Sequence, residues 1–252
     1  MQSELLKPSE LLREYFRSAE LFGEDEFLTA PAVPVKKKPV PISESPEQDP
    51  EIRLKALYEK YAQCQMCPLS KSRKKIVFGT GSARPELLLV GEGPGFEEDR
   101  TGIPFVGPAG KLLDKILAAI GLSRQNVYIL NLVKCRAMKE PDHPEKRGND
   151  RAPTPSEVTA CREILNAQID ILNPPVICTL GSPATKAMLG SDDGITKMRG
   201  RVFDFQFPSG RRTVPLVPTF HPAAVLRNEL LKKDVWHDMK IVRDIVLRSR
   251  SA

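Results

Sequence analysis

The apolar residues of this chain fall into two patterns that predict an alternation of strands and helices. Short continuous apolar runs, which are typical of strands buried on both faces, occur at 87–90, 126–132 and 176–180. Apolar residues recur with helical three- and four-residue spacing in four other segments, namely 51–63, 108–120, 156–172 and 228–248. We therefore predict the α/β class, with a mostly parallel central sheet flanked by helices on both faces in an α/β/α sandwich.

Two further segments extend this pattern. Residues 201–207 and 212–217 flank Pro208-Ser209-Gly210 and are expected to pair as a hairpin whose second arm leads to His221. Residues 138–155 are polar and rich in proline, which predicts a long loop.

The first fifty residues differ in composition from the rest of the chain. Ser9 can cap a helix that ends near Gly23, whereas residues 31–50 contain six prolines and cannot build a core. We expect residues 1–50 to form a helical extension on a disordered linker, followed by one α/β domain over 51–252. The extension helix could dock on an unknown protein partner, fold back on its own domain, or have no defined role.

Composition narrows the class of protein further. The chain has no run of eighteen apolar residues and no charged-then-apolar leader, which predicts a cytoplasmic protein with no membrane partner. The formal net charge is +6, and because the first fifty residues carry more acidic than basic side chains, the positive excess lies in the predicted domain. Such a basic body favours a polyanion such as nucleic acid, although a solubilising surface explains the charge equally well.

A glycine-rich loop follows the first predicted strand. Gly91, Gly93 and Gly95 leave backbone amides open to a ligand, and α/β sheets bind ligands beyond the carboxyl ends of their strands. A phosphate-binding loop of a nucleotide-binding enzyme is one interpretation. It is the weaker one, because the loop lacks both the Lys-Ser/Thr ending of a Walker motif and the G-x-G-x-x-G spacing.

Polar and aromatic side chains gather near the predicted strand ends. Asn131 ends the second strand and His221 follows the hairpin, so an amide and an imidazole converge on one sheet edge. Phe105 lies in the glycine-rich stretch, and Glu92 and Glu98 supply carboxylates. Each residue also has a structural explanation: a turn-forming Asn, a turn-capping His, a core ring and solvated loop carboxylates. Together they predict one site with an amide, an imidazole, a carboxylate and an aromatic ring.

The five cysteines do not suggest a disulfide framework in a chain predicted to be intracellular. Cys64 and Cys67 form a C-x2-C pair, a spacing that lets two thiolates bind one metal or cluster. Cys135 follows a strand and Cys161 lies on the next helix, so both could complete a four-thiolate site. The spacing does not separate zinc from a 4Fe-4S cluster or from buried thiols. Cys178 lies within an apolar strand and is expected to be a buried small hydrophobe.

Five motifs in combination resemble one family. They are Gly91-Glu92-Gly93-Pro94-Gly95, Gly102-Ile103-Pro104-Phe105-Val106-Gly107-Pro108-Ala109-Gly110, Asn131-Leu132-Val133-Lys134-Cys135-Arg136, Pro153-Thr154-Pro155 and His221-Pro222-Ala223-Ala224. From about Leu54 to the C-terminus the chain resembles the family 4, or iron–sulfur, uracil-DNA glycosylases. The resemblance implies a DNA repair enzyme that hydrolyses the N-glycosidic bond of uracil in single- or double-stranded DNA and leaves an abasic site. We expect it to act as a monomer.

The resemblance also implies a cofactor. A 4Fe-4S cluster would be held by Cys64, Cys67, Cys135 and Cys161. In this family the cluster is expected to be structural, bracing loops near the DNA surface without redox turnover in the reaction.

Roles for the strand-end residues follow from the same resemblance. Phe105 would stack on the flipped uracil, Asn131 would pair with its O4 and N3–H, and His221 would donate a hydrogen bond to its O2. Relatives with a water-activating Asp carry it at the position of Gly93, so this chain lacks that base. Glu92 and Gly93 are expected to line the uracil pocket, and the water would be oriented by Glu92, by Glu98 or by backbone carbonyls.

Three residues after His221 are candidates for contact with DNA. Val225 and Leu226 lie where the wider superfamily uses an apolar wedge to fill the vacated base stack, and Arg227 follows them. The alternative is that Val225 and Leu226 pack in the core.

The chain departs from the family pattern between Cys135 and Cys161, where Lys139 to Asp150 form an apparent insertion. A related branch traps uracil-DNA covalently through a histidine of a basic insertion at this place. The insertion of this chain holds His143 and Lys146-Arg147, but the chain keeps Cys135 and lacks the basic-Ile-His run of that branch. We therefore predict turnover, with a covalent or non-turnover uracil-DNA-binding protein as the alternative.

Overall fold

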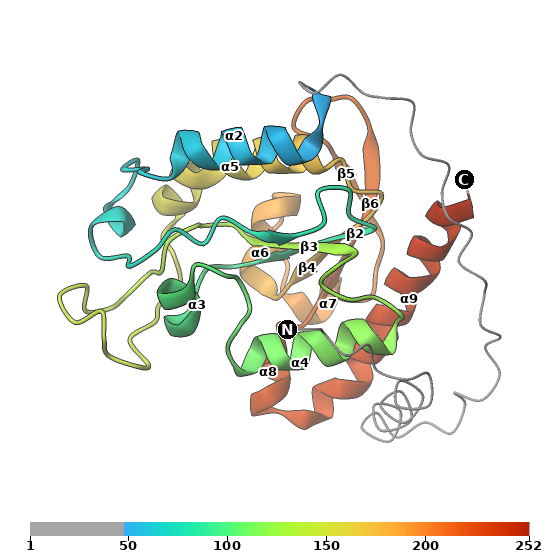
Figure 1. The fold of residues 1–252 in the computed structure, drawn as a ribbon. Coiled ribbons are helices and arrows are strands. Elements are labelled where there is room, and N and C mark those ends of the chain that lie inside the picture. Colours follow the sequence, from blue (N-terminus) through green and yellow to red (C-terminus); the bar gives the residue numbers. More distant parts are fainter. Residues whose placement is uncertain (1–47, 252) are drawn as a thin grey trace, which may run out of the picture.

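Figure 1 shows a computed structural model of the chain, in which residues 48–251 are described. The predicted extension helix from Ser9 to Gly23 and nearly all of the proline-rich linker lie outside the described residues. The predictions for residues 1–47 therefore stay predictions.

Among the described residues, six strands form one mixed sheet in the order β1-β3-β2-β4-β6-β5. The strands are β1 (Thr80–Gly81), β2 (Leu87–Gly91), β3 (Val127–Asn131), β4 (Ile177–Leu180), β5 (Phe203–Gln206) and β6 (Thr213–Thr219). The four central strands run parallel, whereas β1 and β5 pair antiparallel at the two edges. The α/β class is confirmed, but the mostly parallel order holds only for the centre of the sheet. β5 and β6 are the arms of one hairpin and must therefore run antiparallel.

Helices connect and cover these strands. They are α2 (Pro50–Tyr61), η3 (Pro68–Lys71), α3 (Phe96–Thr101), α4 (Pro108–Ala119), α5 (Pro155–Leu172), α6 (Ser182–Leu189), α7 (Ile195–Met198), α8 (Pro222–Arg227), η4 (Glu229–Leu231) and α9 (Lys232–Ser251). In Figure 1, α2 and α5 lie together above the sheet, and α4 and α8 lie below it. Within residues 48–251, no helix combines the length and the apolar character needed to traverse a bilayer.

Alternate side chains of β2 face two separate hydrophobic cores. Leu87 and Leu89 pack with residues of α4 and α9, whereas Leu88 and Val90 pack with residues of α2 and α5. All four side chains are fully buried, as expected for a strand enclosed on both faces. Burying each of them stabilises the fold by roughly 1.5–3 kcal/mol relative to exposure.

Local sequence fixes where the helices next to the site begin. Thr154 and Glu157 form a reciprocal capping box at the start of α5, and Pro155 occupies its first turn. Arg151 adds two hydrogen bonds of 2.8 Å to the same Glu157 carboxylate. The end of the long loop that precedes α5 is therefore anchored to that helix.

The C-terminal segment differs from its prediction as one helix over 228–248. The Asn228 side chain accepts a hydrogen bond from Leu230 N at 3.1 Å and so caps the short helix η4, and α9 begins only at Lys232. Polar capping by Asn228 thus interrupts an otherwise helical apolar pattern.

A buried polar network joins α9 to the end of β6. Asp238 of α9 accepts a hydrogen bond of 2.7 Å from Thr219 Oγ1 and bonds of 3.0 and 2.6 Å from Arg199 Nε and Nη2. Asp238 has no exposed surface. Because Thr219 stands two residues before His221, this network fixes the strand end that carries the imidazole.

We expect Asp238→Ala to lower the free energy of unfolding by about 2–3 kcal/mol, because Thr219 and Arg199 would lose their buried acceptor, while Arg199 keeps its ion pair with Asp234. Urea denaturation measures the loss. The matched control is Asp244→Ala on the same helix, whose ion pair with Arg243 is exposed, and it should cost no more than about 1 kcal/mol. Equal losses in the two variants would contradict the bracing role of Asp238.

Candidate active site

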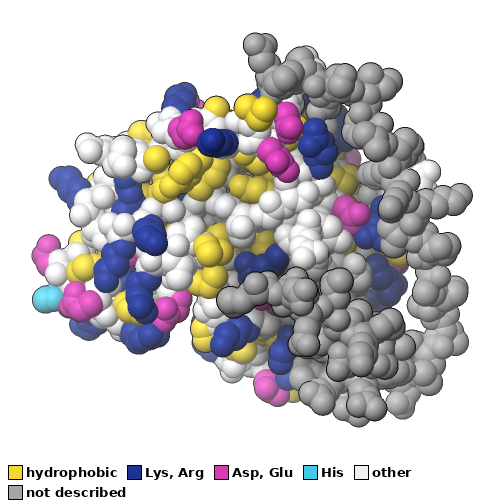
Figure 2. All heavy atoms as spheres, in the orientation of Figure 1, with side chains coloured by type: hydrophobic (Ala, Val, Ile, Leu, Met, Phe, Trp, Pro, Cys, Tyr) yellow, Lys and Arg dark blue, Asp and Glu magenta, His cyan; other side chains and the backbone are white. Residues whose placement is uncertain are grey.

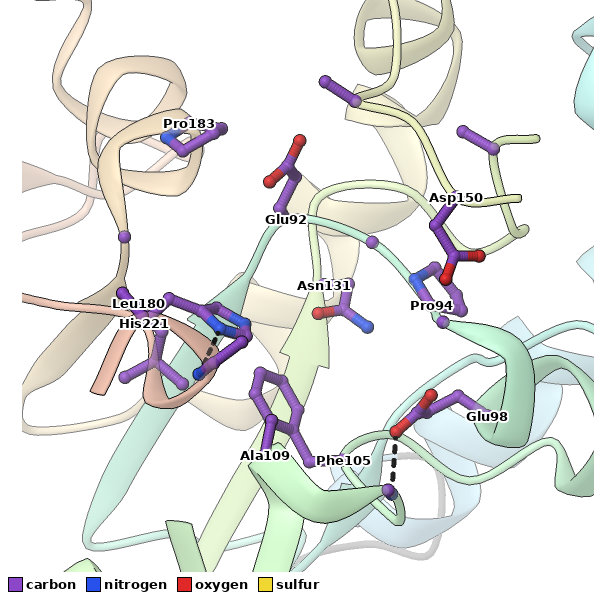
Figure 3. A pocket seen from close by; sticks show the side chains of 18 of the residues that line it. Glu92, Pro94, Glu98, Phe105, Ala109, Asn131, Asp150, Leu180, Pro183 and His221 are labelled. Atoms are coloured by element: carbon purple, nitrogen blue, oxygen red, sulfur yellow. Dashed lines mark hydrogen bonds between the residues drawn. The ribbon is translucent and has the colours of Figure 1, made fainter. Parts of the chain in front are cut away.

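A cavity of about 750 Å³ opens at the carboxyl edge of the sheet. The loops after β2, β3, β4 and β6 meet there, so residues far apart in sequence face one space (Figure 3). The structure brings together all six residues selected for catalysis or uracil binding: Glu92, Gly93, Glu98, Phe105, Asn131 and His221. A cavity of this size is in the range that binds small ligands.

Asn131 carries the most informative polar atom of the cavity. It ends β3, it is 1% exposed, and its Oδ1 has no hydrogen-bond partner within the described part of the chain. A buried acceptor without a partner costs about 1–3 kcal/mol, so this atom is poised for a donor from a ligand. Gly91 pairs with Asn131 across the sheet, and a Cβ on Gly91 would lie only 2.3 Å from Oδ1. The cavity floor therefore requires glycine at this position.

Phe105 holds its ring in the cavity by an unusual backbone conformation. Its φ is 54°, in the left-handed region that bulky residues rarely adopt. Arg124 donates hydrogen bonds to the carbonyl oxygens of Pro104 and Phe105, which holds this turn from outside. A Cβ on Gly110 would lie 1.7 Å from the Phe105 oxygen, so only glycine lets α4 approach so closely. The ring position is thus fixed by the fold at a local cost.

Glu98 supports the same turn from the other side. Its Oε1 accepts hydrogen bonds from Val106 N at 3.0 Å and from Gly107 N at 3.1 Å. Gly107 is the N-cap of α4, where a carboxylate is also favoured by the helix dipole. Glu98 therefore acts on the segment that follows Phe105, and one of its oxygens is already committed to the backbone.

His221 has a defined tautomer. As N-cap of α8 it accepts a hydrogen bond from Ala223 N at its Nδ1, over 3.1 Å. Burial first, and the positive charge of Arg227 second, lower the pKa of His221 to about 4. A neutral imidazole that accepts at Nδ1 must carry its proton on Nε2. His221 is therefore a neutral hydrogen-bond donor at neutral pH.

The rings of His221 and Phe105 lie side by side, with centroids 5.4 Å apart and planes inclined by 30°. Figure 3 shows Asn131 facing the same space and the Glu92 carboxylate at its upper rim. Burial raises the pKa of Glu92, so its carboxyl keeps a proton to higher pH than an exposed glutamate. The arrangement can stack a planar ring on Phe105 and bind its edge by an amide and an N–H donor.

The three candidates after His221 have different surroundings. Val225 is 2% exposed and packs in the core between the sheet, α4 and α9, so its side chain does not reach the surface and we leave it out of the DNA contacts. Leu226 is 50% exposed. Arg227 lines the cavity. The burial alternates because α8 packs one side of its short helix on the core.

The four predicted cysteine ligands are neighbours. Cys135 and Cys161 are buried in one small cluster against which Cys67 packs, and Cys64 and Cys67 both act electrostatically on Cys161. Burial raises the pKa of Cys135 to about 12, with Arg73 Nη1 lying 3.5 Å from its Sγ as a partial compensation. Within residues 48–251, no group of three or more His, Cys, Asp or Glu side chains is arranged to hold a metal ion. Cys178 is fully buried, as predicted.

Sequence reasoning missed the residues that hold the site in shape. Arg124 follows α4 in a polar stretch, and no local sequence pattern predicts its hydrogen bonds to the carbonyl oxygens of Pro104 and Phe105. Arg147 and Asp150 of the apparent insertion line the cavity, whereas His143 does not. His143 is exposed and its Nδ1 lies 3.6 Å from Glu145.

Comparison with known proteins gives the class of this fold and site. The model of the uracil DNA glycosylase superfamily matches residues 78–245, so the chain belongs to that superfamily. The chain is 41% identical over 191 residues to a type-4 uracil-DNA glycosylase of Thermotoga maritima, covering 75% of this chain and 92% of that protein. It is 38% identical over 199 residues to a type-4 uracil-DNA glycosylase of Sulfurisphaera tokodaii, covering 77% and 85%. The chain belongs to the type-4 uracil-DNA glycosylase family, which confirms the predicted resemblance.

We expect His221 to remain neutral, with its proton on Nε2, throughout the range from pH 5.5 to 8. The pKa near 4 means that protonation begins only when the pH falls well below that range. Imidazole ¹⁵N chemical shifts across the pH series measure both the charge and the tautomer. A midpoint near 6.5, the ordinary value for histidine, would contradict this description of the site.

Proposed function

We propose that this chain hydrolyses the bond between uracil and deoxyribose in DNA, releasing uracil and leaving an abasic site. One observation carries the proposal: Asn131 Oδ1, buried and without a hydrogen-bond partner among residues 48–251, lies in a cavity that also holds the Phe105 ring and the His221 donor. Membership of the type-4 family supports the same reaction. Uracil stacked in DNA cannot reach this cavity, so the nucleotide must flip out at a cost of a few kcal/mol.

Recognition of uracil would rest on Asn131. Its Oδ1 accepts the N3–H of uracil and its amide N–H donates to O4, while Phe105 stacks on the ring. Cytosine presents an acceptor at N3 and a donor at N4, so both bonds would be lost and buried polar groups left unpaired. A site of this kind discriminates steeply, because each unpaired buried group costs free energy.

Bond cleavage would rest on stabilising the leaving group. As the C1′–N1 bond breaks, negative charge develops on uracil O2, and His221 Nε2–H donates to that oxygen. A neutral donor is sufficient, because the hydrogen bond strengthens as negative charge grows on O2. The low pKa of His221 keeps the donor form constant over the physiological range.

Glu92 is the better of the two candidate carboxylates for orienting the attacking water. Glu98 has Oε1 engaged by two backbone amides, whereas no hydrogen bond of the Glu92 carboxylate occurs within residues 48–251. We assign Glu98 to positioning the Phe105 turn and Glu92 to the water. Because burial raises the Glu92 pKa, the carboxylate form is lost earlier on acidification than for an exposed glutamate.

DNA would be held by groups around the rim. Arg227 lines the cavity and can meet a backbone phosphate, and the exposed Leu226 can fill the space that the flipped base vacates. Single- and double-stranded substrates are both compatible with this arrangement.

We further propose that Cys64, Cys67, Cys135 and Cys161 hold a 4Fe-4S cluster. All-thiolate donors suit such clusters, and a cluster of several irons keeps its thiolates farther apart than one metal ion would. Burial raises the pKa of the two buried thiols, so their thiolates need nearby positive charge, which bound iron provides. When bound, the cluster supplies a rigid joint between the α2–η3 segment, the end of β3 and α5.

A denaturing gel with a uracil-containing single-stranded oligonucleotide tests the reaction, because turnover leaves an alkali-labile abasic site. We expect His221→Ala to lower the single-turnover rate by roughly 10²–10³-fold, since it removes the preorganised donor. Glu98→Gln should cost much less, because its amide oxygen can still accept the two backbone bonds. Equal losses in the two variants would contradict leaving-group stabilisation by His221.

The same gel distinguishes the alternative, a covalent or non-turnover binder of uracil-DNA. Trapping would give a shifted protein–DNA band instead of an abasic site. The exposed position of His143, paired with Glu145 outside the cavity lining, favours turnover.

For the cluster we expect Cys161→Ala to abolish visible absorbance and to remove iron and labile sulfide from the purified protein. The matched control is Cys178→Ala, which truncates a fully buried thiol in β4 outside the proposed ligand set. It should retain iron and absorbance. Loss of iron in both variants, or in neither, would contradict the ligand assignment.

A further inference from the structure

The apparent insertion, residues 139–150, forms one wall of the cavity. Three of its residues line the cavity, namely Arg147, Gly148 and Asp150, and Arg147 pairs with Glu97 of α3, which lines it too. Figure 3 shows Asp150 and Pro94 close together on that side, across from His221. The DNA strand that carries a base held in the cavity must therefore pass over this wall or over the opposite wall.

The wall is braced from beneath by Arg136, whose side chain has no exposed surface. Its Nε donates to Asp150 Oδ1 at 2.5 Å, its Nη1 to Pro144 O at 2.7 Å and its Nη2 to Lys146 O at 3.0 Å. Three atoms of one planar guanidinium thus hold three points of the insertion. Such a fork fixes geometry more strictly than a single bond can.

Hydrogen bonds within the insertion also hold its two ends together. Asn149 is 1% exposed, accepts from Glu140 N at 2.8 Å, and donates to the carbonyl oxygens of Glu140 and His143 at 2.8 and 3.0 Å. The chain leaves through Arg151, which is bound to Glu157 of α5. The insertion therefore presents a defined surface to the cavity.

On that surface, Arg147 exposes 71% of its side chain. Its guanidinium stacks over Phe96 at 4.6 Å from the ring centroid and lies 2.6 Å from Glu97 Oε1. The buried Arg136 lies over the same ring at 5.1 Å. Stacking on Phe96 orients Arg147 at the rim without consuming its outward N–H donors.

Basic and acidic side chains alternate around Arg147. In Figure 2, Lys and Arg side chains lie among Asp and Glu side chains on the left of the molecule, over the region where Figure 1 shows α3 and the long loop after β3. An exposed ion pair such as Arg147–Glu97 contributes little to stability and is readily exchanged for a stronger anion.

We propose that Arg147 binds a backbone phosphate of the DNA strand whose uracil occupies the cavity, exchanging Glu97 for that phosphate. Arg136 is the positioning residue that holds the insertion for this contact. The proposal rests on the uracil-DNA glycosylase reaction. It gives the insertion a role in binding substrate rather than in chemistry at the base.

Excision kinetics on a uracil-containing single-stranded oligonucleotide, measured over a series of salt concentrations, test the proposal. Arg147→Gln should raise KM on the order of fivefold at low salt, with the single-turnover rate at saturation unchanged. The slope of log KM against log salt should fall by about 0.7, the value for one phosphate contact on a single strand. The melting temperature should be unchanged, because the lost ion pair is exposed.

Two further variants separate the phosphate contact from a structural effect. Arg211→Gln removes an exposed arginine paired with Asp170 at the β5–β6 hairpin, outside the cavity lining, and should alter neither KM nor the slope. Glu97→Gln frees Arg147, and with it Arg100, which lies 3.2 Å from the other Glu97 oxygen, and it should lower KM about two- to fivefold.

A contact that only stabilises the fold predicts the opposite sign for Glu97→Gln. The proposal is overturned if Arg147→Gln and Arg211→Gln share one salt slope, or if Arg147→Gln lowers the saturated rate without raising KM. Failure of the glycosylase assignment looks different, because the unaltered protein would then release no uracil at any salt concentration.

Discussion

The close approach of three residues at the end of two parallel strands is the constraint on which the site depends. Gly91 ends β2 directly beside Asn131 at the end of β3, and the Phe105 ring packs over both. A Cβ on Gly91 would lie 2.3 Å from Asn131 Oδ1 and 2.8 Å from Phe105 Cζ. The parallel register places the ends of β2 and β3 side by side. Because Gly91 has no side chain, the Asn131 amide and the Phe105 ring can both approach it at the bottom of the cavity. A side chain on Gly91 would push the amide and the ring apart, and a flat base could not then meet both.

Several features of the site are unfavourable in the free protein. Asn131 Oδ1 is buried without a partner in the described part of the chain, and Phe105 adopts a left-handed backbone conformation. His221 is kept neutral by burial. Each costs free energy that the two cores on either side of the sheet offset. Because these groups are already oriented, little reorganisation is needed when charge develops on the leaving base.

The sequence predicted the parts of this molecule that follow local rules. The continuous apolar run at 87–90 is the buried strand β2, and the capped apolar pattern at 156–172 is α5. Asn131 and His221 could be selected because strand ends in α/β sheets converge at one edge. Their meeting with Phe105 and Glu92 in one cavity follows from this general rule of topology.

The rest could not be predicted because it depends on contacts between distant segments. Arg124 supports the Phe105 turn from a separate loop, and the buried Arg136 looks in sequence like any surface arginine. The burial of Val225 beside the exposed Leu226 depends on how one short helix packs. The antiparallel edge strand β1 has two residues, too few to give a periodic signal.

Six consecutive residues, 131–136, connect the chemistry of the cavity to the cysteines and to the insertion. Asn131 faces the base site, and its carbonyl oxygen accepts a 2.7 Å bond from Lys134 Nζ, a side chain with no exposed surface. Cys135 then belongs to the proposed cluster site, and Arg136 braces the insertion. Because one short segment carries all three groups, the packing around Cys135 helps to fix the positions of Asn131 and of the insertion.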